Sequence, residues 1–559
     1  MTAPVLEVQG LTTHFFTRQG EMPAVRNVSF SLQAGEVLGL VGESGSGKSV
    51  TGFSILGLVD APGRIVSGSV KLNGKELVGL PEPELRKRRG REIAMIFQDP
   101  IATLNPMLSI GDQMRMALFA HEKRSLKAAN ARCIELLGRV GITDPEAGLK
   151  AYPHEYSGGM RQRVAIAIAL LHNPSVIIAD EPTTALDVSI QAQILSEMQD
   201  LVRESGTALI WITHDLAVVA SLAKRLAVMY RGEIIETGPT FDVLRNPEHE
   251  YTANLLAALP SNAEPGQLLA QGGTVPSPPS VQETAKPPKK EDFLKVSNAN
   301  QVFSPKISLG EKIAGFVGTG NRRNSTHAVK DVTLRVARGE TLGLVGESGS
   351  GKSTLGRLMA GILPPTSGQI LLDDAPVMQA GKKATLRVQT VFQDPFASLN
   401  PRMKVGRAVS EGALAHGLIK PSDATDYVKS WFERVGLEPE WADRFPHQFS
   451  GGQRQRVAIA RALAMQPDVL ICDEPVASLD VSIQAQIINL FLELQKGLGL
   501  TMVFISHDLS VVRHLSDRVA VMYLGEIVEI GPAEEIYNLP VHDYTKRLLD
   551  AVPVIDLNC

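Results

Sequence analysis

The chain contains the stretch Gly42-Glu43-Ser44-Gly45-Ser46-Gly47-Lys48-Ser49 and repeats it letter for letter from Gly346 to Ser353. Ser157-Gly158-Gly159 likewise returns as Ser450-Gly451-Gly452. An Asp-Glu pair and then a histidine follow in each half. The spacing is the same in both: 24 residues from serine to glutamate (157 to 181, 450 to 474) and 33 from glutamate to histidine (181 to 214, 474 to 507). Equal spacing indicates two copies of one domain, and the two functional sites can be built between the copies.

Length and charge narrow the class of protein. A chain of 559 residues is too long for one core, and two domains of about 260 residues fit the repeat. The net charge of −4 offers no overall attraction to nucleic acid or to anionic lipid. A locally basic run, residues 85–91, has two interpretations: a solvated surface turn, or a contact with lipid head groups or a partner.

Cysteines and apolar runs exclude other classes. The three cysteines, at positions 133, 472 and 559, have no metal-type spacing and fit a reducing compartment rather than a disulfide framework. The first residues show no signal-peptide pattern. No apolar run approaches the roughly 18 residues that a membrane-spanning helix needs. If the protein moves a solute across a membrane, another chain must supply the channel.

The repeat predicts one domain at residues 1–260 and a second at residues 293–559. Residues 261–292 between them are rich in Pro, Gly, Ser and Gln and show no period. This composition predicts a flexible, partly extended linker. Such a linker would keep the two halves at high mutual concentration.

Short apolar runs precede each repeated motif. Such runs, rich in β-forming residues, indicate strands buried on both faces, and hence an α/β fold with a parallel sheet covered by helices. The motifs then follow the carboxyl ends of strands, where open α/β sheets bind ligands. The runs are 37–41, 176–179 and 208–212 in the first half, and 341–345, 469–472 and 502–505 in the second.

The glycine-rich stretch after a strand and before a helix predicts a phosphate-binding loop for a nucleotide. Glycines let backbone N–H groups turn onto phosphate oxygens, and the helix N-terminus adds its positive dipole end. The lysine would reach the β- and γ-phosphates, and the last serine would bind Mg²⁺. A single match can be a coincidental glycine turn; two matches in the same context favour the ATP site. The predicted loop residues are Gly42, Ser44, Gly45, Ser46, Gly47, Lys48 and Ser49, and Gly346, Ser348, Gly349, Ser350, Gly351, Lys352 and Ser353.

The Asp-Glu pairs, Asp180-Glu181 and Asp473-Glu474, end apolar runs. We expect each aspartate to hold Mg²⁺ and each glutamate to polarise the attacking water as a general base, which contributes about 10²–10⁴ in rate. An isolated Asp-Glu pair after a strand is more often a helix cap, but the fixed spacings favour catalysis here.

His214 and His507 follow strands and precede Asp-Leu. A lone histidine at such a place is usually structural. Its repetition at equal spacing predicts instead a contact with the γ-phosphate in each half.

Ser157-Gly158-Gly159 and Ser450-Gly451-Gly452 each open a predicted helix. Serine is a good helix cap, and a capped helix is the simplest interpretation. The same features make an anion site. Since each half already has a loop for its own phosphates, this second site makes sense if it faces the nucleotide that the other half holds.

Taken together and in this order, the motifs resemble the ATP-binding cassette (ABC) family. The resemblance covers both halves and leaves out only the linker. It implies that each half has a mainly parallel sheet core, an antiparallel β subdomain and a helical signature subdomain. It also implies that the cassettes pair head to tail within the chain, with each ATP between the loop of one and the signature of the other. One site would then use Lys48, Asp180, Glu181 and His214 with Ser450, and the other Lys352, Asp473, Glu474 and His507 with Ser157.

The same resemblance assigns four more residues. Gln98 and Gln393 match glutamines that contact Mg²⁺ and relay the state of the nucleotide to a membrane partner. Phe15 and Phe303 fall where an aromatic side chain stacks on adenine.

Further motifs are similar to the peptide/nickel importer ATPases. They are Phe97-Gln98-Asp99-Pro100 and Phe392-Gln393-Asp394-Pro395, and the closing His249-Glu250-Tyr251-Thr252 and His542-Asp543-Tyr544-Thr545. The first half resembles the D-type and the second the F-type ATPase of oligopeptide and dipeptide importers. The resemblance implies a peripheral protein on the cytoplasmic face of the inner membrane, with two transmembrane permease subunits and an extracytoplasmic solute-binding protein as partners.

Two departures from the pattern bear on the sites. With so few cysteines the chain cannot build the iron–sulfur cluster that some relatives carry. Met160 follows the first Ser-Gly-Gly at a position where glutamine is commoner, and Gln453 occupies the corresponding position in the second half. A methionine at this position is usual in the D-type half. Neither half lacks a catalytic residue, so we expect two competent ATP sites.

Two alternatives differ in class. A soluble twin-cassette ATPase acting on ribosomes or DNA would typically carry a charged helical linker or zinc-binding cysteines, and this chain has neither. A sugar-importer ATPase commonly has one degenerate cassette, whereas both are intact here. The transported solute (peptide, glutathione, nickel chelate, opine or sugar) is not encoded in these motifs.

Overall fold

The computed structural model describes the chain except residues 1–2, 19, 100–102, 184–185, 271–291, 304–324, 478, 554 and 556–559. Most of the predicted linker, and Cys559, therefore lie outside the described residues. The chain divides into two compact units, Met1–Leu256 with Ala551–Cys559, and Ala257–Asp550. Each contains one copy of the repeated motifs.

The first unit is built on a six-stranded sheet in the order β10-β9-β3-β8-β7-β6. All neighbours are parallel except β9 and β10. The strands β3, β7 and β8 are buried along their whole length, as their continuous apolar sequences predict. Their bounds are β3 Val37–Val41, β6 Ile93–Ile96, β7 Val176–Asp180, β8 Ala208–Thr213, β9 Arg225–Tyr230 and β10 Glu233–Pro239.

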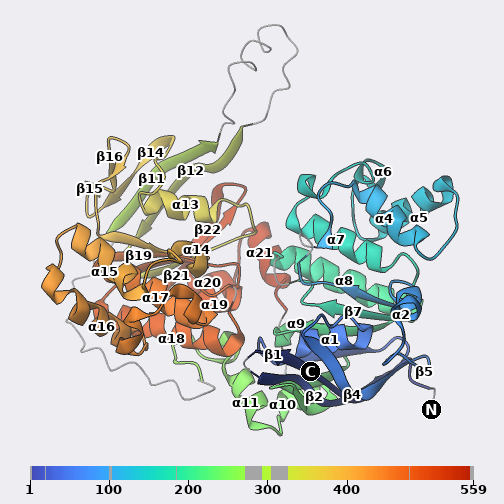
Figure 1. The fold of residues 1–559 in the computed structure, drawn as a ribbon. Helices are drawn as coiled ribbons and strands as arrows, with labels where there is room; N and C mark the ends of the chain where they lie inside the picture. The colour runs from blue at the N-terminus through green and yellow to red at the C-terminus, as the bar shows by residue number, and fades with distance from the viewer. Residues whose placement is uncertain are drawn as a thin grey trace, which may run out of the picture. The chain divides into compact units, whose positions relative to one another are not determined.

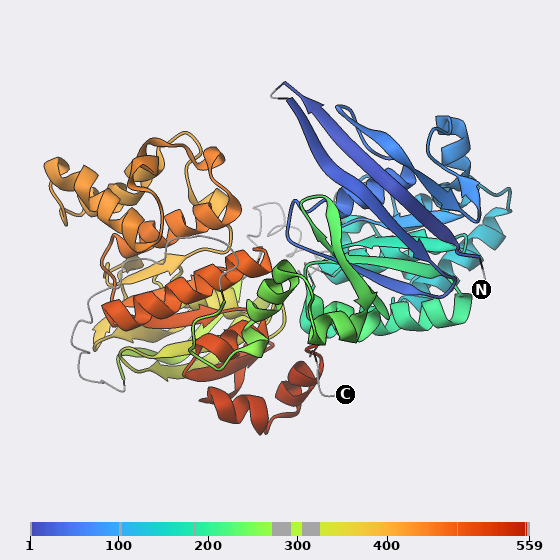
Figure 2. The same cartoon turned by 90° about the horizontal axis from the view of Figure 1, so that it is seen from below.

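A second, antiparallel sheet of the first unit has the order β2-β1-β4-β5. Its buried face and strands of the main sheet share one core, which includes Leu6, Leu32, Leu38 and Ile210. Seen from below, these long strands and the main sheet form separate layers (Figure 2). The strands are β1 Leu6–Thr17, β2 Gly20–Leu32, β4 Gly63–Leu72 and β5 Lys75–Glu76.

The helices of the first unit divide into two groups. Helices α4 to α7 lie together, away from the antiparallel sheet (Figure 1), as a helical subdomain would. The others flank the sheets. The helices are α1 Lys48–Leu56, α2 Glu82–Arg88, α4 Ile110–Phe119, α5 Leu126–Arg139, α6 Pro145–Gly148, η1 Pro153–Glu155, α7 Gly158–Ala169, α8 Val188–Ser205, α9 Leu216–Leu222, α10 Thr240–Arg245 and α11 Glu250–Ala257.

The second unit repeats this architecture. Its main sheet has the order β18-β19-β20-β13-β21-β22, parallel except for β21 and β22. Its antiparallel sheet has the order β12-β11-β14-β15, and a small hairpin pairs β16 with β17. The strands are β11 Leu294–Phe303, β12 Thr326–Val336, β13 Thr341–Val345, β14 Ser367–Leu372, β15 Ala375–Pro376, β16 Met378–Gln379, β17 Lys382–Lys383, β18 Val388–Val391, β19 Val469–Asp473, β20 Thr501–Ile505, β21 Arg518–Tyr523 and β22 Glu526–Pro532.

Helices α15 to α17 form the helical part of the second unit (Figure 1). The helices are η2 Pro260–Asn262, α13 Lys352–Met359, α14 Pro395–Ser398, α15 Val405–Ala415, η3 Pro421–Asp423, α16 Ala424–Arg434, η4 Pro439–Asp443, η5 Pro446–Gln448, α17 Gly451–Leu463, α18 Val481–Leu498, α19 Leu509–Leu515, α20 Ala533–Asn538 and α21 Asp543–Asp550. The predicted fold class, a parallel core with an antiparallel β subdomain and a helical subdomain in each cassette, is confirmed.

Residues 261–270, which we assigned to the linker, belong to the second unit. The apolar side chain that anchors this segment is Leu269, which is buried. Its backbone N–H donates to Asn489 Oδ1 (2.8 Å), and its carbonyl accepts from Asn489 Nδ2 (2.9 Å). This described part of the predicted linker thus packs against α18.

The basic run at residues 85–91 comprises the last residues of α2 and the turn that follows this helix. Three of its five cations pair with nearby carboxylates: Lys87 with Glu84 (2.6 Å), Arg88 with Glu92 (3.2 Å) and Arg89 with Glu82 (2.6 Å). Arg89 also donates to the carbonyl of Leu56 (2.7 Å). These partners favour the interpretation as a surface turn over a patch for lipid head groups.

Candidate active site

The glycine-rich loop joins a buried central strand to a helix in each unit. Gly47 precedes α1 with φ 103°, and Gly351 precedes α13 with φ 110°. A Cβ at these positions would lie 2.4 Å from the carbonyl of Ala24 and 2.2 Å from that of Ala328. Only glycine combines this backbone conformation with this close approach. The helix N-termini therefore begin at the loop, with their N–H groups available for anions.

The loop lysine folds back over its own loop. Lys48 Nζ donates to the carbonyls of Gly42 (2.7 Å) and Glu43 (2.8 Å). Lys352 makes the same two bonds, each of 2.7 Å, to Gly346 and Glu347. Both lysines are buried. The loop backbone thus fixes the position of the ammonium group over the loop.

The last loop serine contacts the aspartate of the Asp-Glu pair. Ser49 Oγ donates to Asp180 Oδ1 (2.9 Å), and Ser353 Oγ to Asp473 Oδ1 (2.8 Å). Burial raises the pKa of Asp180 to about 6, and burial likewise raises the pKa of Asp473. Burial disfavours the ionised form of a carboxyl group, and here the nearby positive charge does not offset that effect.

This serine–aspartate pair fits Mg²⁺. Its donors are hard oxygens, and the missing positive charge is what a divalent cation supplies. In the part of the chain that the structure describes, no cluster of three or more His, Cys, Asp or Glu could hold a metal. Few protein ligands are typical of Mg²⁺, which keeps waters and binds substrate phosphates.

The glutamate of each pair is held between a glutamine and a histidine. Glu181 Oε2 accepts from Gln98 Nε2 (2.8 Å), and Glu181 Oε1 lies 3.3 Å from His214 Nδ1. In the second unit the corresponding distances are 2.6 Å from Gln393 and 3.4 Å from His507, both to Glu474. The structure therefore brings together, in each half, three side chains that are far apart in sequence.

The backbone of both glutamates is strained. Glu181 has φ 44° and Glu474 φ 48°, in the left-handed region. Such a conformation costs a non-glycine residue about 1–3 kcal/mol and is found where the surrounding structure requires it. A backbone bond from each N–H, to the carbonyls of Ile212 and Ile505 (both 2.9 Å), holds it in place.

In the second unit the histidine favours the ionised form of the glutamate. Although burial opposes the charge, the hydrogen bond and the positive charge of His507 hold the pKa of Glu474 below its usual value. The bond to Glu474 in turn raises the pKa of His507. Although burial opposes the charge of His214, the bond to Glu181 and the negative charges of Glu181 and Asp215 together raise the pKa of this histidine. An ionised carboxylate at this point can polarise a water molecule.

The signature serines cap helices. Ser157 Oγ accepts from the N–H of Met160 at the start of α7, and Ser450 Oγ from that of Gln453 at the start of α17 (both 3.3 Å). Gln453 Oε1 also accepts from the N–H of Ser450 (3.0 Å), a reciprocal bond that a methionine cannot make. The glycines after the serines allow close packing, since a Cβ at Gly452 would lie 2.3 Å from Ile483.

The two predicted adenine contacts lie on antiparallel strands. Phe15 is on β1, and Phe303 ends β11 with 45% of its surface exposed. An exposed ring can stack on a base. Stacking on adenine stays a prediction.

One contact to the loop went unnoticed in the sequence. The hydroxyl oxygen of Tyr251 accepts from the N–H of Glu43 (3.1 Å), and that of Tyr544 from the N–H of Glu347 (3.0 Å). The available signal was the repeated His-x-Tyr-Thr segment, which we interpreted only as a subfamily mark.

Comparison with known proteins decides the family. Residues 25–184 and 329–477 match the family "ABC transporter". The chain belongs to the ABC transporter family. It is an ABC transporter ATPase with two cassettes, and it binds ATP. Residues 235–286 and 528–558 match a second family, "Oligopeptide/dipeptide transporter, C-terminal region". The predicted resemblance to peptide-importer ATPases is confirmed.

Curated relatives resemble this ABC ATPase over its whole length. It is 44% identical to the glutathione import ATP-binding protein GsiA of Pectobacterium atrosepticum, over 99% of this chain and 90% of that protein. The GsiA protein of Escherichia coli K12 is also 44% identical, with the same coverage. Among solved structures, the ATP-binding cassette MJ0796 in a dimeric post-hydrolysis state bound to ADP and Pi is 28% identical over 42% of this chain and 98% of that chain, with a TM-score of 0.39. Within the described residues of this ATPase, no helix has the length and apolar character to cross a membrane.

Proposed function

We propose that this protein powers a bacterial importer of glutathione or related peptides by hydrolysing ATP at two sites. The main observation behind the proposal is that, in each half, a glutamine and a histidine both contact the carboxylate of one glutamate. Support for the solute class comes from the relatives, which are named as glutathione import proteins, and from the peptide-transporter C-terminal regions in both halves. Two intact halves support two competent sites.

Each residue has a defined task in hydrolysis. The loop N–H groups and Lys48 would bind the β- and γ-phosphates and neutralise their charge. Glu181 would orient the attacking water and accept its proton, while His214 holds that carboxylate and contacts the γ-phosphate. Ser49 and Asp180, with Gln98, would hold Mg²⁺, which supplies charge stabilisation at the phosphates when bound. The corresponding residues of the second half would act in the same way; they are Lys352, Ser353, Gln393, Asp473, Glu474 and His507.

We propose that each site is completed by the signature of the other cassette. In either half the capped helix after Ser-Gly-Gly presents a second anion-binding N-terminus, although its own loop already has one. Ser450 would then complete the site of Lys48, and Ser157 that of Lys352. Binding of ATP would draw the cassettes together, and hydrolysis would release them.

Separate permease subunits would receive this movement at the inner face of the membrane, with a solute-binding protein delivering cargo outside. A groove of 340 Å³ in the first unit supports a docked partner, since it is lined by the apolar side chains of Leu58, Phe97 and Ile168 and by His121. Phe97 adjoins Gln98, which contacts the catalytic glutamate. A helix seated in this groove could therefore sense the nucleotide. Mass spectrometry of the ligand on the cognate binding protein would identify the solute.

The combined change Glu181→Gln and Glu474→Gln tests the hydrolytic assignment. We expect ATP still to bind, because glutamine keeps the size of the side chain and leaves the phosphate loop unchanged. Turnover should fall at least about 100-fold, since the base is lost. ATPase rate and equilibrium binding of ATP, measured on the same preparation, give the two readouts. Near-normal hydrolysis would remove both glutamates from the role of base.

A further inference from the structure

The C-terminal segment of each cassette touches its phosphate loop through one tyrosine. Tyr251 lies at the start of α11 and Tyr544 at the start of α21. Each hydroxyl oxygen accepts from the N–H of the second loop residue, Glu43 (3.1 Å) or Glu347 (3.0 Å). The contact joins segments 208 and 197 residues apart, so it is a tertiary feature made twice with the same atoms.

The loop residue that the tyrosine holds also holds the lysine. The N–H of Glu43 goes to Tyr251, and its carbonyl accepts from Lys48 Nζ (2.8 Å). Glu347 shows the same arrangement, with 2.7 Å between its carbonyl oxygen and Lys352 Nζ. A shift of this residue would therefore displace the ammonium group that is to meet the phosphates. The tyrosine acts on the lysine through a single residue.

The tyrosine is itself held rigidly. The ring of Tyr251 lies against that of Tyr230, with centroids 4.3 Å apart. The backbone N–H of Tyr251 donates to His249 Nδ1 (3.0 Å). In the second cassette the ring of Tyr544 lies 4.1 Å from that of Tyr523, and its N–H donates to His542 Nδ1 (3.1 Å).

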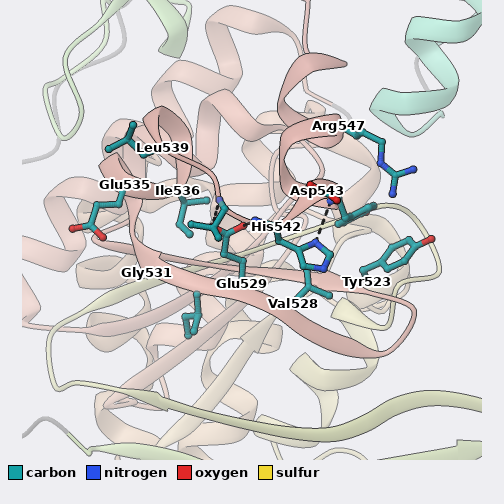
Figure 3. Close-up of a pocket in the computed structure, with 13 residues that line it drawn as sticks. Tyr523, Val528, Glu529, Gly531, Glu535, Ile536, Leu539, His542, Asp543 and Arg547 are labelled. Carbon is teal, nitrogen blue, oxygen red and sulfur yellow. Dashed lines mark hydrogen bonds between the residues drawn. The ribbon is translucent and has the colours of Figure 1, made fainter.

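A carboxylate anchors the turn before each tyrosine. Glu529 accepts from the N–H groups of Val541 (2.8 Å) and His542 (3.0 Å), and Figure 3 shows Glu529 beside His542. Glu236 accepts in the same way from Glu248 (2.8 Å) and His249 (3.3 Å). The segment therefore reaches the loop with little freedom to move.

A neighbouring turn in each cassette makes a second hydrogen bond to the phosphate loop. The N–H of Gly232, in the turn between β9 and β10, donates to the carbonyl of Ser46 (2.9 Å). Gly525 donates to Ser350 over the same distance. The loop backbone is therefore held at two points, at its second residue by the tyrosine and at Ser46 or Ser350 by the turn.

We propose that Tyr251 and Tyr544 are positioning residues for ATP, through which the oligopeptide-type C-terminal regions brace the two phosphate loops. The inference rests on the proposed role of these loops in ATP binding. The brace stabilises the loop conformation in which the lysine is in place, so the free protein need not reorganise to bind. Loss of the hydroxyl should weaken ATP binding and leave the chemical step nearly intact.

The test is the combined change Tyr251→Phe and Tyr544→Phe, which keeps both ring pairs. A single uncharged hydrogen bond contributes about 0.5–1.5 kcal/mol, so we expect Kd and KM for ATP to rise about 3- to 10-fold with kcat nearly unchanged. The matched control is Tyr230→Phe with Tyr523→Phe, which removes hydroxyls from the other rings of the same pairs. The control should keep the affinity of the parent protein, whatever small change in Tm it shows.

Equal affinities for the tyrosine variant and the parent protein would overturn the proposal, as would equal losses in the tyrosine variant and the control. Lys48→Ala with Lys352→Ala separates this outcome from failure of the proposed function. If the lysine variant loses ATP and the tyrosine variant does not, only the brace is wrong. If the lysine variant binds ATP normally, the loops are not the ATP sites.

Discussion

At the scale of single residues, backbone geometry decides what the site can contain. Glycine is required at Gly47 because both its φ and its distance to the Ala24 carbonyl exclude a Cβ. Glu181 is the opposite case: its backbone has a left-handed conformation that suits glycine better. Here a side chain is needed, because its carboxylate contacts both Gln98 and His214.

Gly47→Ala should destroy the first phosphate loop. The substitution combines an unfavourable φ with a clash against backbone, which we expect to cost at least about 2 kcal/mol of unfolding free energy and to abolish ATP binding by that loop. Gly74→Ala is the control, since Gly74 also has a positive φ (76°) but nothing within 4 Å of its Cβ position. The control should be destabilised without losing ATP. Binding stoichiometry and thermal unfolding of both variants measure the difference.

At the scale of elements, the first residues of the predicted linker, 263–270, form a strap within the second unit. Residues 263–270 contact α18 and α19: Leu269 bonds twice to Asn489, the N–H of Gly266 donates to the carbonyl of His514 (2.9 Å), and His514 Nε2 donates to the carbonyl of Gln267 (2.8 Å). The strap thus stabilises a cassette other than the one whose motifs precede it in sequence.

His514 should make the stability of the strap dependent on pH. Burial lowers the pKa of His514, and its Nδ1 is buried with no hydrogen-bond partner among the described residues, so the folded state disfavours the protonated ring. Below the unfolded-state pKa, near 6.5, the unfolded chain binds a proton that the folded chain rejects. Stability is therefore full above that pH and falls as the pH falls.

His514→Gln should flatten this dependence. Between neutral pH and pH 5, the protection factors of residues 263–270 against hydrogen exchange should fall further in the parent protein than in the variant, and the Tm of the parent should drop further. Identical pH profiles of the two proteins would show that the histidine does not control the strap.

At the scale of the whole molecule, the proposal of shared sites predicts which pairs of lesions fall in one site. Ser450→Arg blocks a signature, and Lys48→Ala disables a loop. If Ser450 completes the site of Lys48, these two changes disable one site and leave the other able to bind ATP. Ser450→Arg with Lys352→Ala should instead disable both.

The number of tightly retained ATP molecules per chain measures this difference. We expect about one for Ser450→Arg with Lys48→Ala and none for Ser450→Arg with Lys352→Ala, in line with loop residues being required for phosphate binding. The reverse result would mean that each cassette binds ATP with its own signature.

Local patterns in the sequence were enough to predict the family, the duplication and the order of elements: glycines before a helix, apolar runs at buried strands, serines at helix caps. Glu181, His214 and their counterparts were predictable because their spacing repeats, whereas the two glutamines were predicted only from the resemblance to the family, since their distance to the glutamate differs between the halves (83 and 81 residues). Which side chains meet across long separations became evident only in the folded chain. Gln98 reaches Glu181 over 83 residues, Tyr251 reaches Glu43 over 208, and Asn489 holds Leu269 over 220. No local pattern encodes these pairs, because packing of whole strands and helices sets the distance between them.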